Sequence, residues 1–109
     1  MIKPGMTFRE IAEKAWPIPE PYMKNRYFVL AHGVGMTGEY PYILHKQDID
    51  ASGYEGMVEA GMTLCVESYV GADGGADGVK LEHQVLITET GAELLSRFPF
   101  EDDLLGREI

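Results

Sequence analysis

Two glutamates occupy equivalent places in the two arms of a predicted β-hairpin over residues 62–88. Both arms are rich in β-branched and aliphatic residues and alternate with period two, and the stretch between them consists almost entirely of small turn formers. A hairpin that is symmetric about the Gly74–Gly75 bond places Glu67 directly opposite Glu82. A slip of one residue in this register would move Glu82 to the other face of the sheet.

Two carboxylates in this arrangement repel each other, by roughly 0.2–1 kcal/mol on an exposed sheet and by more when they are buried. A shared proton, a basic side chain or a cation would offset the repulsion. Convergent carboxylates are also the hard oxygen ligands that bind divalent metals. The alternative is that both glutamates are solvated on the wet face of an antiparallel sheet.

The composition limits the class of protein. The 109 residues are 45% hydrophobic, which fits one folded domain with a modest core. The net charge of −9, without any basic stripe, argues against nucleic acid or an anionic membrane as a partner. The single Cys65 excludes an intrachain disulfide and is interpreted as a small buried hydrophobe. Because no signal peptide or transmembrane run is visible, we expect a cytoplasmic protein.

The hairpin is preceded by one clear helix and a weaker strand pattern. Thr7 and Glu10 form a capping box that predicts a helix ending near Trp16. A near-continuous apolar run predicts a strand over residues 26–31, and three glycines between positions 33 and 38 follow His32 directly. A histidine at the end of a strand is usually structural, but the glycines permit the close backbone approach that is typical of a site.

The remaining segments carry weaker signals. Residues 42–54 are irregular and predict a surface loop that contains His45. Thr90 is a candidate cap for a short helix over residues 91–97, and the tail over residues 99–109 is mostly acidic and is expected to lie on the surface.

Three features of the chain occur in the same order along the sequence. They are the glycine-rich segment at His32, Glu67 in Met-Thr-Leu-Cys-Val-Glu, and Glu82 in Gly-Val-Lys-Leu-Glu. In this order they resemble the C-terminal half of the pita-bread metalloenzymes. This is the family of prolidase, proline-specific aminopeptidase, methionine aminopeptidase and creatinase. The resemblance implies an α+β fold, an antiparallel sheet with flanking helices. It also implies two divalent metal ions, Mn, Fe or Co rather than Zn, with His32, Glu67 and Glu82 as ligands. Two upstream aspartate ligands have no counterpart here. Residues 1–109 are therefore expected to be part of a catalytic domain and inactive in isolation.

The local sequence is most similar to the dimethylsulfoniopropionate lyase branch of that family, in three stretches: 27–41, 64–69 and 94–101. The likeness implies a metal-dependent lyase that removes the α-proton of a small carboxylate, with Tyr27 facing the substrate's sulfonium through a cation–π contact. The branch carries its aspartate base where this chain has Gly38, so the neighbouring Glu39 is the candidate catalytic base.

Two other functions stay open. One is an Xaa-Pro metallopeptidase, although Glu39 occupies the position where the peptidases carry a second histidine. The other is a scaffold or binding module without catalysis. In all three cases we expect self-association, because half of a pita-bread fold leaves apolar surface exposed.

Overall fold

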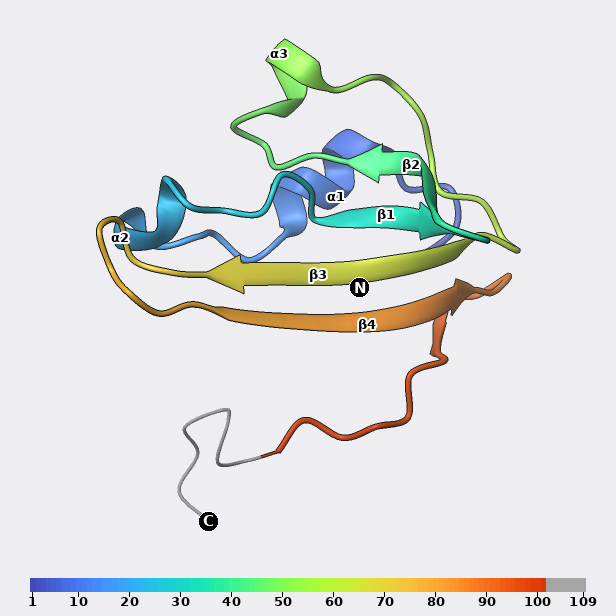
Figure 1. The fold of residues 1–109 in the computed structure, drawn as a ribbon. Helices are drawn as coiled ribbons and strands as arrows, with labels where there is room; N and C mark the ends of the chain where they lie inside the picture. Colours follow the sequence, from blue (N-terminus) through green and yellow to red (C-terminus); the bar gives the residue numbers. More distant parts are fainter. Residues whose placement is uncertain (102–109) are drawn as a thin grey trace.

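The computed structural model describes residues 1–101, which form a five-stranded antiparallel sheet with strand order β2-β1-β3-β4-β5 (Figure 1). The strands are β1 Ala31–Val34, β2 Gly38–Ile43, β3 Thr63–Val70, β4 Val79–Ile87 and β5 Ala92–Leu94. The helices are α1 Phe8–Lys14, α2 Glu20–Met23 and α3 Ile49–Ser52. The predicted α+β class is confirmed. Most of the predicted acidic tail, residues 102–109, lies outside the described residues.

Helix α1 begins where the sequence predicts. The Thr7 hydroxyl accepts a hydrogen bond from the Glu10 backbone N–H at 3.1 Å, and the Glu10 carboxylate accepts one from the Thr7 N–H at 2.8 Å. This capping box satisfies two donors that the first turn would otherwise leave unpaired. None of the helices within residues 1–101 has the length and apolar character that crossing a bilayer requires.

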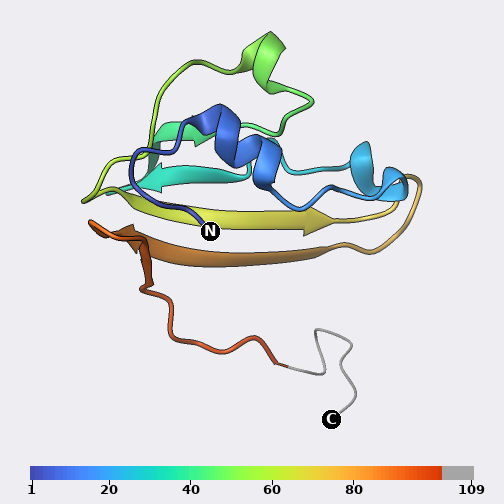
Figure 2. The ribbon, with the colours of Figure 1, turned by 180° about the vertical axis from the view of Figure 1, so that it is seen from behind.

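The core lies between α1 and one face of the sheet. Figure 2 shows α1 lying over the β1 and β2 side, while β4 extends beyond it. Phe8 and Ile11 of α1 are almost fully buried, and they join Ile43, Leu64 and other apolar residues in one cluster. The opposite face of β1, β3 and β4 is free of α1 and carries the candidate ligands.

The hairpin has the predicted register. Antiparallel pairing of β3 with β4 places Glu67 opposite Glu82, and Gly74 supplies a positive φ of 73° in the turn between them. Glycine adopts this left-handed conformation without the steric cost that a side chain adds. The two carboxylates are therefore cross-strand neighbours, as the symmetric turn predicts.

The predicted strand over residues 26–31 is wrong in its position. β1 covers Ala31–Val34, and the apolar residues before it are irregular. Strand extent is decided by the partners on either side, and β1 pairs with both β2 and β3 only from Ala31 onward. As a result, His32 lies inside a central strand and not after its end.

The predicted short helix over residues 91–97 is also wrong. The chain reverses after Thr88, whose hydroxyl accepts a hydrogen bond from the Gly91 N–H at 3.1 Å, and Ala92–Leu94 then pairs with β4 as strand β5. A helix this short is costly to nucleate, whereas the edge of β4 offers unpaired backbone groups at once. Thr90 therefore caps no helix.

Residues 42–54 are not simply a surface loop, because they include the end of β2 and helix α3. His45 in particular is buried, with 7% of its surface exposed, and its Nε2–H donates a hydrogen bond to the Tyr27 carbonyl at 2.7 Å. A carbonyl oxygen only accepts hydrogen bonds, so the bond fixes the tautomer. Burial lowers the pKa of His45 from its ordinary value of 6.5.

The burial of His45 predicts a pH-dependent loss of stability. Because its folded pKa is depressed, the unfolded chain takes up the proton first as the pH falls below 6.5. The free energy of unfolding should therefore decrease below that pH, by up to about 1.4 kcal/mol per pH unit from this group. His45→Gln keeps an N–H donor and removes the titration, so urea unfolding between pH 7.5 and 5 should show a shallower slope. Equal slopes in both proteins would contradict this account.

Candidate metal centre

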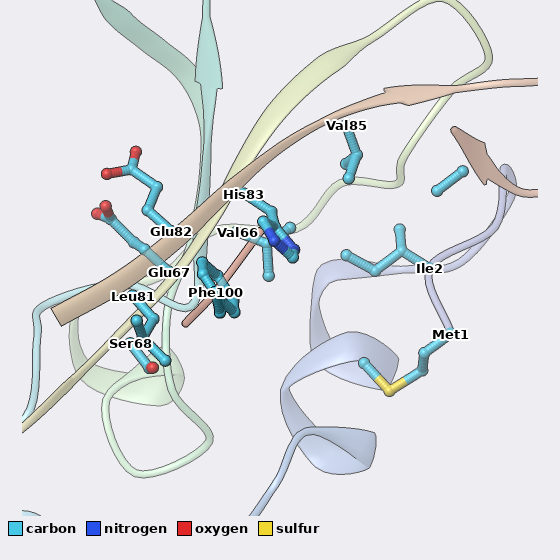
Figure 3. A pocket seen from close by; sticks show the side chains of 11 residues that line it. Met1, Ile2, Val66, Glu67, Ser68, Leu81, Glu82, His83, Val85 and Phe100 are labelled. Carbon is cyan, nitrogen blue, oxygen red and sulfur yellow. The ribbon is translucent and has the colours of Figure 1, made fainter. Parts of the chain in front are cut away.

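The three predicted metal ligands come from three adjacent strands and share one face of the sheet. His32 lies on β1, Glu67 on β3 and Glu82 on β4. Figure 3 shows Glu67 and Glu82 with their carboxylates on the same side of the hairpin. The His32 Nε2 atom is 3.6 Å from Glu67 Oε1, and a ligand atom of Glu82 lies within 4.8 Å of one on His32.

The His32 ring presents a lone pair to this face. Its Nδ1 atom is 2.8 Å from the Gly33 carbonyl oxygen, which only accepts hydrogen bonds, so Nδ1 carries the ring proton. In the neutral ring, Nε2 is then an acceptor. A backbone partner of this kind is the usual way in which a metal-binding histidine is oriented.

Glu67 is the more unusual group. Its side chain is 1% exposed, and within residues 1–101 its Oε1 atom accepts no hydrogen bond. A buried acceptor without a partner costs about 1–3 kcal/mol. Beside a neutral His32 ring, Oε1 therefore faces another acceptor, Nε2, and a cation or a proton held between them would satisfy both.

A basic side chain, Lys80, neutralises part of the negative charge of Glu67 and Glu82. Lys80 Nζ lies 3.2 Å from Glu67 Oε2 and 4.2 Å from the centroid of the Tyr27 ring. The contact shows that the Tyr27 ring face accepts a cation next to the candidate ligands, as a cation–π geometry allows. Strand alternation places Lys80 on the same face of β4 as Glu82, so the sequence carries a signal for this ion pair that the hairpin prediction does not include.

Cys65 joins this group of side chains, although the sequence pattern predicts only a small buried hydrophobe there. It is directly opposite His32 in the β1–β3 pairing, and its Sγ atom lies within 4.8 Å of ligand atoms on His32 and Glu82. Burial raises the pKa of the Cys65 thiol, and the Glu82 carboxylate raises it further. The signal was present in the sequence, since alternation puts Cys65 on the same face as Glu67.

Glu39 is placed apart from this group. It is exposed on β2, and its carboxylate lies over the Gly35 backbone, where a Cβ on Gly35 would overlap it. The preceding residue, Gly38, faces the site instead. A Cβ built on Gly38 would be 3.5 Å from the His32 ring, an ordinary contact distance.

The opposite face of the hairpin forms an apolar groove. In Figure 3, Val66, His83 and Val85 extend away from the two carboxylates toward the N-terminal Met1 and Ile2. The Phe100 ring stacks on the His83 ring with 4.3 Å between the ring centroids. Glu67 and Glu82 also border this groove, although their carboxylates project to the other side of the strands (Figure 3).

The arrangement of histidine and glutamates on adjacent antiparallel strands matches a known family. The profile of "Metallopeptidase family M24" aligns with residues 1–89. The chain belongs to this family. The M24 chain is 44% identical over 107 residues to the dimethylsulfoniopropionate lyase DddP of Roseovarius nubinhibens and 40% identical over 108 residues to that of Roseobacter denitrificans. Its fold is similar to the prolidase from Pyrococcus furiosus, with a TM-score of 0.62 and 32% identity over 91% of this chain. The predicted pita-bread relationship is confirmed.

The match covers a small part of each relative. The alignments with the two lyases include 98% and 99% of this M24 chain but 24% of each lyase, and the prolidase is covered over 28% of its chain. The chain thus spans about a quarter of the length of these proteins. M24 enzymes are metal-dependent, and the donors found here fit a divalent ion: an imidazole nitrogen and two carboxylates, one of which has a buried oxygen without a hydrogen-bond partner within residues 1–101.

Proposed function

We propose that His32, Glu67 and Glu82 are ligands of a divalent-metal centre in an enzyme that acts on small carboxylates. The observation that carries the proposal is the pair His32 Nε2 and Glu67 Oε1, which are 3.6 Å apart, with Oε1 accepting no hydrogen bond from the described residues. Oxygen-rich ligation favours Mn, Fe or Co, and the family resemblance favours two ions.

The proposed reaction is cleavage of dimethylsulfoniopropionate, or a similar compound, to acrylate and dimethyl sulfide. Support comes from the identity with two lyases that are named for this substrate. A base takes the proton α to the carboxylate, the electron pair of that C–H bond forms the double bond, and the C–S bond breaks with its electrons remaining on sulfur. When bound, a divalent ion holds the substrate carboxylate as a Lewis acid and makes the α-proton more acidic.

Two residues of this chain have proposed roles beside the ligands. Tyr27 binds the sulfonium through its ring face, at the place that the Lys80 ammonium occupies in this structure. Glu39 takes the α-proton. Its carboxylate lies over Gly35, so this role requires the side chain to turn toward the His32 side when substrate binds.

The metal centre is tested by calorimetric titration of the 109-residue chain with Mn²⁺ and Fe²⁺. We expect binding in the wild-type chain and its loss in Glu82→Gln, because one of the hairpin carboxylates is then neutral. Glu59→Gln, an exposed substitution before β3, is the matched control and should bind as the wild type does. Equal titrations of the wild type and Glu82→Gln would reject the centre.

The reaction is tested by grafting this chain in place of the matching quarter of the Roseovarius lyase and measuring dimethyl sulfide release. Glu39→Gln should lower the release rate, and Gly38→Asp should raise it, since a Cβ at Gly38 would make only ordinary contacts with the His32 ring. A graft that binds metal but releases no dimethyl sulfide, with or without Gly38→Asp, would exclude the lyase.

The second candidate is an Xaa-Pro metallopeptidase, favoured by the similarity to the solved prolidase. The same graft, assayed with an X-Pro dipeptide, distinguishes the two: hydrolysis without dimethyl sulfide release identifies the peptidase, and neither activity favours a scaffold.

For location and partners, we propose a cytoplasmic protein without nucleic-acid or membrane partners, in keeping with its net charge of −9. We also propose self-association through the apolar groove that Val66, Leu81 and Val85 line.

A further inference from the structure

We propose that Cys65 is a direct metal ligand at this centre, so that His32, Cys65 and Glu82 bind a thiophilic divalent ion of the zinc class. The inference rests on the proposed metal centre and adds a donor that neither the sequence pattern nor the resemblance assigns. It changes the expected metal preference of the protein.

The geometry places the three donors around one point. His32, Cys65 and Glu82 lie on the neighbouring strands β1, β3 and β4, and each offers one ligand atom within 4.8 Å of the other two. Cys65 is 3% exposed and directly opposite His32, so the sheet itself holds its sulfur beside the ring.

A second observation points to a cation beside the same histidine. Glu67 lies two residues after Cys65 on the same face of β3, its side chain is 99% buried, and its Oε1 is without a hydrogen-bond partner within residues 1–101. This oxygen is directed at His32 Nε2, which belongs to the three-donor group. Lys80 contacts the other oxygen of Glu67, so the orphaned atom requires a different positive partner.

The donor set determines which ion fits best. One nitrogen, one sulfur and one carboxylate oxygen are donor types that zinc sites in proteins use. Thiolate sulfur is a soft ligand that favours zinc over manganese. When the sulfur binds the ion, the thiol proton leaves to solvent. Carboxylates alone already bind zinc more tightly than manganese, and the sulfur should widen that difference.

Cobalt titration of the 109-residue chain tests this directly. Because Cys65 is the single cysteine, a near-ultraviolet thiolate-to-cobalt charge-transfer band reports on its sulfur alone. We expect the band in the wild type, its displacement by zinc, and its absence in Cys65→Ser and Cys65→Ala. Because the loss of a group that only orients a ligand already costs roughly 10–100-fold, loss of the sulfur itself should lower zinc affinity by at least that factor in both variants, with manganese affinity changed far less.

His83→Gln is the matched control for His32→Gln. His83 neighbours Glu82 but projects from the other face, so its variant should keep the band while His32→Gln loses it. Cobalt binding to the wild type without the band would overturn the role of Cys65 and leave the proposed centre standing. Absence of any cobalt, zinc or manganese binding would overturn both. The wild-type spectrum decides the question even where a variant fails to fold.

Discussion

Glu67→Gln should stabilise the metal-free chain while it abolishes metal binding. The substitution removes the charge of a carboxylate that is almost fully buried and opposite Glu82, and it gives the unpartnered Oε1 position a group that can also donate. The loss of the half-exposed Lys80 ion pair offsets part of the gain. We expect the free energy of unfolding in EDTA to rise by about 1 kcal/mol.

Excess metal should reverse the order of stability. At a free manganese concentration of about 100 Kd, the wild type gains about 2.7 kcal/mol by mass action, and Glu67→Gln gains nothing. Urea unfolding with EDTA and with manganese measures both effects, and Glu59→Gln serves as the neutral control. If Glu67→Gln were less stable than the wild type in EDTA, the orphaned oxygen would not be the source of strain inferred here.

Gly33→Ala should be the most damaging small substitution near the site. A Cβ on Gly33 would overlap the backbone carbonyl of Tyr40 on β2, and backbone cannot move aside as a flexible side chain does. The β1–β2 pairing would have to open beside His32, where its register already shifts. We expect a loss of about 3 kcal/mol in the free energy of unfolding and weaker metal binding.

Gly38→Ala provides the matched comparison. Its Cβ would make ordinary contacts, at 3.5 Å from the His32 ring and 3.9 Å from the Tyr42 hydroxyl. We expect a change within about 0.5 kcal/mol and unchanged metal affinity. Thermal unfolding and manganese titration of both variants measure the difference. Similar losses in the two would mean that the close approach of β1 to β2 is not what Gly33 provides.

The sequence by itself determined the local features of this protein. The capping box of Thr7 and Glu10 and the register that pairs Glu67 with Glu82 both depend on residues close in the chain or on a symmetric turn. Alternation and turn chemistry act over short distances, so they are visible without the fold.

Only the tertiary structure decided which segments complete the sheet and which groups meet on it. Three features depend on partners that are distant in the sequence: the residue at which β1 starts, the formation of strand β5 in place of a helix, and the burial of His45. The same is true of Cys65 beside His32, and of the unpartnered oxygen of Glu67. Strand pairing and desolvation depend on residues that are far apart in the sequence, and they outweigh the local preference of a segment for helix or strand. The residue pattern of one segment therefore does not reveal them.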